Sequence, residues 1–179
     1  MTGSLFGAAA PGFGRPLDVL EACHGRIARQ CDTLDKLLDH LPAYGSDTQA
    51  QQAARAVLAY FDTAVVHHHD DEERNLFPLL ELSEASGACD LVETLTLEHD
   101  ELGLLWRRLR ASLQQIESSE TSALDEALTR RFIALNRTHL EFENTHVLPL
   151  ARQVLDAADL ERLGRAMAAR RGVPFAGSL

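Results

Sequence analysis

The sequence lacks an excess of positive charge and lacks any long apolar run. Its 179 residues carry 17 Lys and Arg against 27 Asp and Glu, a formal net charge of −10, and Lys36 is the single lysine. An acidic chain is repelled by phosphate backbones and by anionic lipid surfaces. No run approaches the roughly 20 apolar residues of a membrane-spanning helix. These two absences argue against nucleic acid and membranes as partners.

Cysteine is also scarce, and the N-terminus shows no export signal. Cys23, Cys31 and Cys89 cannot all pair with one another, and their spacing is not that of a metal site. Such cysteine usage favours the reducing cytoplasm. The start of the chain, MTGSLFGAAAPGFGRP, has no basic segment, and its apolar stretch is too short for a signal peptide. We therefore expect a cytoplasmic protein.

A third absence is the alternation of apolar and polar residues that is typical of β-strands. Apolar residues instead recur every three or four positions in four long stretches, which predicts amphipathic helices. Turn-forming residues separate these stretches at 41–47, 83–87 and 117–122. The pattern predicts an all-α, up-down-up-down four-helix bundle. The bundle should span residues 16–155, after a flexible tail at 1–15 and before a short helix and C-terminal tail at 156–179.

Two details of these helices are open to test. Pro78 and Pro149 lie late in the second and fourth helices, where a proline removes a hydrogen bond and predicts a kink or an early stop. The short last helix has an apolar edge formed by Leu160, Leu163 and Met167. That edge covers either the bundle or a second copy of the chain, which would make a homodimer.

What the sequence does contain is histidine, with eight in all. One lies on the apolar stripe of each predicted bundle helix: His24, His68, His99 and His139. A dehydrated imidazole needs a polar partner, so an ordinary apolar core has no reason to bury four of them. A metal ion would be a partner for all four at once.

Two of these histidines have a glutamate four residues later. His68–Glu72 and His139–Glu143 are both His-x-x-x-Glu, and residues four apart share one helix face, about 6 Å apart along the axis. Each helix therefore directs an imidazole and a carboxylate to the same place. Two inward carboxylates suit a pair of ions, because a carboxylate can bridge two cations. Imidazole together with carboxylate favours iron, manganese or zinc.

His69 and Glu73 offer a second register on the same helix. The two late prolines favour Glu72 and Glu143 as the matching pair, because a proline follows each of them by six residues. In an up-down-up-down bundle the second and fourth helices run parallel, so equal offsets give equal levels. We therefore expect the register that contains Glu72.

The other residues of this run are expected outside the centre. At about 100° per residue, three consecutive histidines cannot all face the core. His67 is expected in solvent, and His69 either in solvent or packed beside the ligands. Asp70 and Asp71 are expected to form a solvated acidic face.

These motifs resemble the hemerythrin-like, or HHE cation-binding, family over about residues 16–155. The matching segments are HHDDEERNLFPLL at 68–80 and HLEFENTHVLPLA at 139–151, with single histidines in EACHGRI at 21–27 and EHD at 98–100. The resemblance implies a four-helix bundle around two non-haem iron ions, with two bridging carboxylates and an oxygen-derived bridge. It implies Glu72 and Glu143 as the bridges and, as terminal ligands, His24, His68, His99 and His139.

One feature differs from the oxygen-carrying hemerythrins, whose third helix presents two histidines four residues apart. Here Leu95 and Gly103 occupy the positions four residues from His99. The fifth terminal ligand is therefore left open among His69, Glu73, Glu98, His146 and water.

Such a centre is compatible with several functions. Histidine-rich ligation with a vacant position suits a protein that binds or senses dioxygen, nitric oxide or iron. It also suits a redox enzyme that removes peroxide, donates iron or repairs clusters; a regulatory module without functional metal is a third reading. The pairs Glu21–His24 and Glu143–His146 also fit the Glu-x-x-His spacing of ferritin-like iron-oxidising sites. That assignment leaves three of the stripe histidines without a role.

Overall fold

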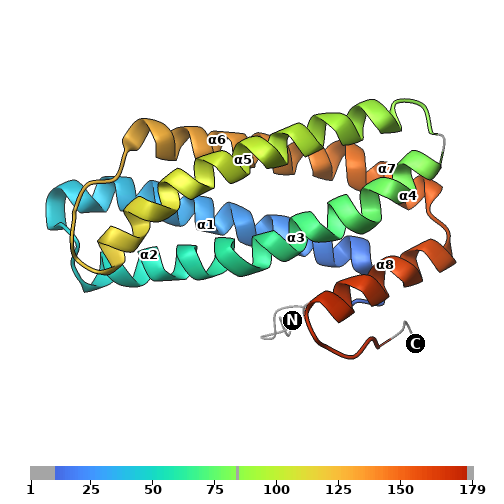
Figure 1. The fold of residues 1–179 in the computed structure, drawn as a ribbon, viewed down its shortest axis with the longest axis horizontal. Helices are drawn as coiled ribbons and strands as arrows, with labels where there is room; N and C mark the ends of the chain where they lie inside the picture. The colour runs from blue at the N-terminus through green and yellow to red at the C-terminus, as the bar shows by residue number, and fades with distance from the viewer. Residues whose placement is uncertain (1–10, 84, 177–179) are drawn as a thin grey trace, which may run out of the picture.

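The computed structural model describes residues 11–83 and 85–176, and every regular element within them is helical (Figure 1). Four long helical rods lie side by side, and a shorter helix, α8 (Ala157–Arg170), packs at one end of them. The loops that join consecutive rods alternate between the two ends of the molecule (Figure 1). None of the helices in the described residues is long and apolar enough to cross a membrane.

The first rod is α1 (Pro16–Tyr44). Pro16 occupies its first turn, where the missing backbone N–H would have no helical partner anyway. The helix ends at Gly45, whose φ of 66° lies in the left-handed region that favours glycine. Two residues later the Asp47 side chain accepts a hydrogen bond from the Ala50 N–H at 2.9 Å and caps the second rod.

The second rod is one unbroken helix in which two π-helical turns alternate with α-helical segments. Its segments are α2 (Thr48–Tyr60), η1 (Phe61–Val65), α3 (Val66–Asp71), η2 (Glu72–Leu76) and α4 (Phe77–Leu82). Of the kink or early stop predicted at Pro78, the early stop does not occur, because the rod continues to Leu82. The π turn η2 lies directly before this proline, and its i→i+5 hydrogen bonding carries the helix past the residue that lacks an N–H.

The third rod is a single helix, and the fourth shares with the second a π turn that precedes a proline. The third is α5 (Ala88–Glu117), and the fourth consists of α6 (Glu126–Phe142), η3 (Glu143–Val147) and α7 (Leu148–Val154). Asp125 caps α6 by accepting from the Leu128 N–H at 2.9 Å. The π turn η3 again precedes the proline, Pro149, and the helix again continues.

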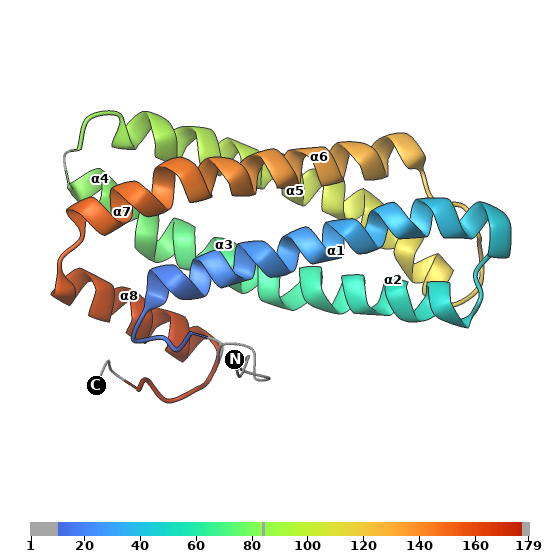
Figure 2. The same ribbon diagram turned by 180° about the vertical axis from the view of Figure 1, so that it is seen from behind.

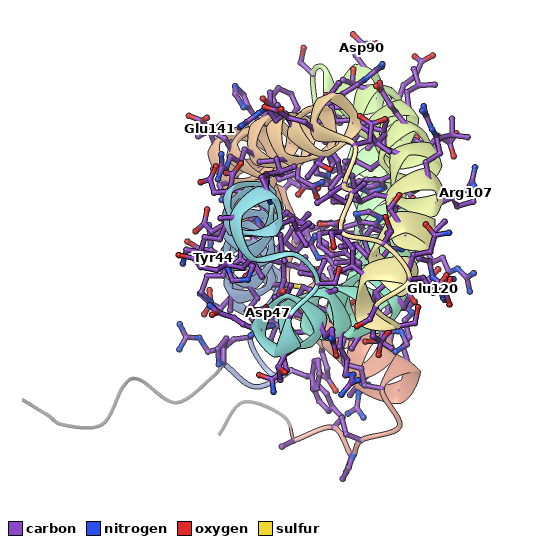
Figure 3. The ribbon with its side chains drawn as sticks, turned by 90° about the vertical axis from the view of Figure 1, so that its left-hand side faces the viewer. Tyr44, Asp47, Asp90, Arg107, Glu120 and Glu141 are labelled. Atoms are coloured by element: carbon purple, nitrogen blue, oxygen red, sulfur yellow. The ribbon has the colours of Figure 1, made fainter. Side chains whose placement is uncertain are left out.

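The apolar core consists of two clusters with a polar layer between them. One cluster contains Ile27 and Phe132, and the other contains Leu20, Phe77 and Leu148. Each rod passes from one cluster to the other at its stripe histidine. A view along the bundle shows side chains filling its interior, while labelled charged residues such as Arg107 and Glu141 point outward (Figure 3). The polar layer is therefore enclosed between the two apolar clusters.

The short helix α8 covers the bundle itself. Leu163 and Met167 are buried against the same chain, so the apolar edge of α8 needs no second copy, and a homodimer stays a prediction. Phe13, in the segment predicted as a flexible tail, packs beside α8 with the Arg171 guanidinium 5.4 Å from its ring centre. Figure 2 shows the start of α1 lying next to α8. The rest of that segment, residues 1–10, and residues 177–179 lie outside the described residues.

Candidate metal centre

The structure brings six predicted site residues together in the polar layer: the four of the two His-x-x-x-Glu motifs and the two single histidines. They come from all four rods, and each is at most 5% exposed: His24, His68, Glu72, His99, His139 and Glu143. Burial of this many polar side chains at one level is unusual, since polar groups in a core need partners.

The two glutamates have the same local setting. Glu72 is the first residue of η2 and Glu143 is the first residue of η3. A proline follows each π turn, in the second position of the next α-helical segment. π turns in helices occur frequently at functional sites. The equal offsets between glutamate and proline thus correspond to equal placement in the folded chain.

The carboxylates lie between the histidines, and the two oxygens of each face different rings. For Glu72, Oε1 lies 3.4 Å from His68 Nε2 and Oε2 lies 3.7 Å from His99 Nε2. For Glu143, Oε2 lies 3.2 Å from His24 Nε2 and Oε1 lies 3.4 Å from His139 Nε2. Each carboxylate therefore spans two groups of imidazoles, as a bridge between two ions would.

Two sets of potential ligand atoms result. The two-histidine set contains His24 and His68 together with both glutamates, and the three-histidine set contains His69, His99 and His139. In each set the ligand atoms lie within 4.8 Å of one another. The two sets share the space between the rods, with the carboxylates at their boundary.

His69 is the residue that completes the second set. Its ring is stacked on that of His99, with centroids 3.9 Å apart and an interplanar angle of 15°. Because adjacent helical residues diverge by about 100°, His68 faces His24 of α1 while His69 faces α5. His69 was expected either in solvent or beside the ligands, and the structure places it beside them; of the side chains left open as a fifth ligand it is the one that joins a set. His67 belongs to neither set.

Glu73 and Glu98 lie at the rim of the centre rather than within it. Glu73 Oε1 accepts a hydrogen bond from His99 Nδ1 at 2.7 Å, and Glu98 Oε2 accepts one from His139 Nδ1 at the same distance. Asn144, which the sequence did not single out, is placed similarly, because its Oδ1 accepts from His24 Nδ1 at 2.7 Å. These contacts orient the rings so that each Nε2 points inward.

His146 and Glu21 lie away from the centre. His146 is exposed and stacks on Phe142, with centroids 4.5 Å apart. The π turn η3 rotates it off the stripe that an uninterrupted α-helix would continue from His139, so His146 is not supported as the fifth ligand. Glu21 forms an exposed ion pair with Arg152 at 2.6 Å. The ferritin-like pairs are therefore not assembled.

Asp71 corrects a second expectation. It is completely buried rather than solvated, because α8 covers it with two arginines. Arg170 donates to its Oδ1, and Arg171 Nη2 lies 2.7 Å from its Oδ2. Asp70 keeps a half-exposed position and pairs with Arg74 at 2.9 Å. The carboxylate next to Glu72 thus anchors the C-terminal helix to the rod that carries the centre.

Protonation in the centre is strongly perturbed. Desolvation and repulsion from Glu143 raise the pKa of Glu72 well above its ordinary value. Burial opposes charge on both Glu143 and His139, but the attraction between the carboxylate and the ring, 3.4 Å apart, prevails, lowering the pKa of Glu143 to about 2 and raising the pKa of His139 to about 9. A cation bound in this layer would favour the deprotonated form of each of these groups, so binding would release protons.

The unpaired atoms of the centre fit metal cations. Buried ligand atoms without a hydrogen-bond partner include Nε2 of His24 and His68, Oε2 of Glu72 and both oxygens of Glu143. His99 Nε2 and His139 Nε2 lie 3.1 Å apart. Because Nδ1 of each ring donates to a carboxylate, Nε2 is the acceptor atom of each neutral ring, and the two acceptors face one another. Inward-facing acceptor atoms are what a cation requires, and imidazole with carboxylate suits borderline metals.

Comparison with known proteins agrees with this geometry. The family model of the hemerythrin HHE cation-binding domain matches residues 15–151, which include all seven residues of the two sets. An uncharacterized protein of Haemophilus influenzae is 31% identical over 161 residues, which cover 90% of this chain and 92% of that protein. With the buried His/Glu centre and the helical fold, these matches show that the chain belongs to the hemerythrin HHE cation-binding domain family.

Proposed function

We propose that this protein holds two iron ions, one at each histidine set, and binds or senses a small ligand such as dioxygen or nitric oxide, or senses iron itself. The observation that carries the proposal is the division of each carboxylate, with one oxygen toward each set. A single ion would not need two carboxylates placed in this way.

The histidines and glutamates of the centre would have different roles in binding such a pair of ions. Five imidazoles would be the terminal ligands, and Glu72 and Glu143 would bridge and offset the charge of the ions. The two apolar clusters on either side keep bulk water out of the layer. When bound, two iron ions supply one-electron redox chemistry and an open position for a small ligand.

A cavity beside His69 supports a small ligand of low polarity. It has a volume of about 100 Å³ and is lined mainly by apolar side chains, with Phe61, Trp106 and Phe132 among them. The polar N–H of Trp106 is already donated to Asp62 Oδ1 at 3.0 Å. A cavity of this kind can admit a diatomic molecule and disfavours charged ones.

The experiment is metal analysis of protein purified without chelator, together with optical spectra of the iron-loaded form. We expect two iron ions per chain and a charge-transfer absorption that changes when azide is added. Glu72→Gln and Glu143→Gln should each lose the paired signature, whereas Glu81→Gln, an exposed change on the same rod as Glu72, should keep it. A full iron complement without colour, or one ion per chain, would contradict the proposal.

Two further expectations are part of the same proposal. The up-down-up-down order of the rods is supported by loops at alternating ends of the bundle (Figure 1). A cytoplasmic location is supported by the cysteine usage of the sequence.

A further inference from the structure

The two histidine sets differ in the hydrogen-bond partner of Nδ1, the ring nitrogen that faces away from the centre. In the three-histidine set, His99 and His139 each donate from Nδ1 to a carboxylate, Glu73 and Glu98, at 2.7 Å. In two of the three imidazoles, Nδ1 is thus hydrogen-bonded to a carboxylate, a contact that we call carboxylate backing.

In the two-histidine set, neither Nδ1 is hydrogen-bonded to a carboxylate. His24 donates from Nδ1 to the neutral amide oxygen of Asn144 at 2.7 Å. His68 Nδ1 is buried and has no hydrogen-bond partner. The same ring nitrogen therefore meets a carboxylate, an amide or nothing, depending on the set.

The carboxylates of Glu73 and Glu98 remain partly exposed to water, so the desolvation cost of their charge is small. The side chains of Glu73 and Glu98 are 42% and 26% exposed, whereas Glu72 and Glu143 are 1% exposed. A carboxylate that accepts from the far nitrogen of an imidazole raises the basicity of the nitrogen that faces the metal.

We propose that Glu73 and Glu98 are positioning residues that make the three-histidine site the tighter of the two, so that it fills first and the two-histidine site exchanges its ion. The inference rests on the proposed two-ion function. Asn144 keeps the second site weaker because an amide withholds the charge that a carboxylate would supply. When iron is limiting, the protein then holds one ion, on the three-histidine side.

The test is a titration of the chelator-stripped full chain with Co²⁺ alone, followed by the absorption of the bound ion. We expect two binding steps at least tenfold apart in affinity. Glu73→Gln and Glu98→Gln should each weaken the first step by about 10–100-fold and leave the second unchanged. Asn144→Asp should strengthen the second step by about tenfold, toward the first.

The control is Glu101→Gln. Glu101 lies on α5 three residues after Glu98 and pairs with Arg131 on the surface, so neither step should change. The gain expected for Asn144→Asp separates the proposal from loss of folding, because an unfolded fraction weakens binding and does not strengthen it. The absorption bands of the first ion should also shift in Glu98→Gln, which a purely structural role would not cause.

The outcomes separate the inference from the function beneath it. Two equal steps in the unmodified protein, or a Glu98→Gln change that weakens the second step, overturn the inference while two-ion binding stands. Binding of fewer than two Co²⁺ per chain overturns the proposed function and this inference with it.

Discussion

The buried carboxylate of Asp71 allows a quantitative prediction about how α8 is attached. Asp71 is completely buried, and its partners Arg170 and Arg171 have side chains only 15% and 22% exposed. Removal of one partner from a buried ion pair costs about 3–5 kcal/mol. Both arginines can turn toward water once the carboxylate is lost, so we take the lower end, about 3 kcal/mol, for Asp71→Asn.

This loss should be visible as a shift in melting temperature. For a chain of this size, 1 kcal/mol corresponds to about 2–4 °C, so Asp71→Asn should melt about 6–12 °C below the unmodified protein. The measurement is thermal unfolding followed by circular dichroism. It is made on chelator-stripped protein, so that changes in metal affinity do not contribute.

The matched control is the neighbouring residue. Asp70 pairs mainly with Arg74, whose side chain is 71% exposed, and lies at 3.9 Å from Arg170 Nε, which keeps its closer contact with Asp71 in the variant. Surface pairs such as Asp70–Arg74 are worth about 0–1 kcal/mol. Asp70→Asn should therefore shift the melting temperature by no more than about 4 °C. If Asp71→Asn and Asp70→Asn melt at the same temperature, the reasoning about the buried anchor is refuted.

Three further predictions follow from the same structure. Chelation should lower the melting temperature, because a metal at a thousand times its Kd stabilises the folded state by about 4 kcal/mol; an unchanged melting temperature after metal is added back would contradict a metal bound to the folded protein. Affinity for Co²⁺ should rise by up to about tenfold per pH unit between pH 6.5 and 8.5, because the pKa of His139 near 9 means that a proton must leave before the ring can bind; a flat profile would contradict this assignment. Gly164→Ala should destabilise the packing of α8 by about 1–3 kcal/mol in urea unfolding, because the added Cβ would lie 2.1 Å from the Phe13 carbonyl oxygen; a stability equal to that of the unmodified protein would show that the contact yields freely.

The helical period made most of the centre predictable. His68 with Glu72 and His139 with Glu143 share a helix face by spacing alone, and four histidines on apolar stripes needed a common partner. These inferences depend on residues within one helix, where 3.6 residues per turn decides which side chains lie together. The register that contains Glu72 could be chosen because a proline marks the same offset in two helices.

Other parts of the centre depend on elements far apart in the sequence. The sequence left the place of His69 open between solvent and the centre, because its neighbour His99 lies thirty positions later on another rod. The burial of Asp71 depends on α8, about a hundred residues away. The rim contacts of Glu73, Glu98 and Asn144 likewise join different rods, as no spacing within one helix could reveal.

The sequence by itself determined that this chain is helical, that it carries two His-x-x-x-Glu motifs on apolar faces, and that a metal centre is the natural partner for them. The tertiary structure alone decided that five histidines divide into two sets, that each glutamate faces both, and that the sets have unequal backing. The physical reason is that helix periodicity orients side chains about one axis, whereas ligand sets form where several axes meet.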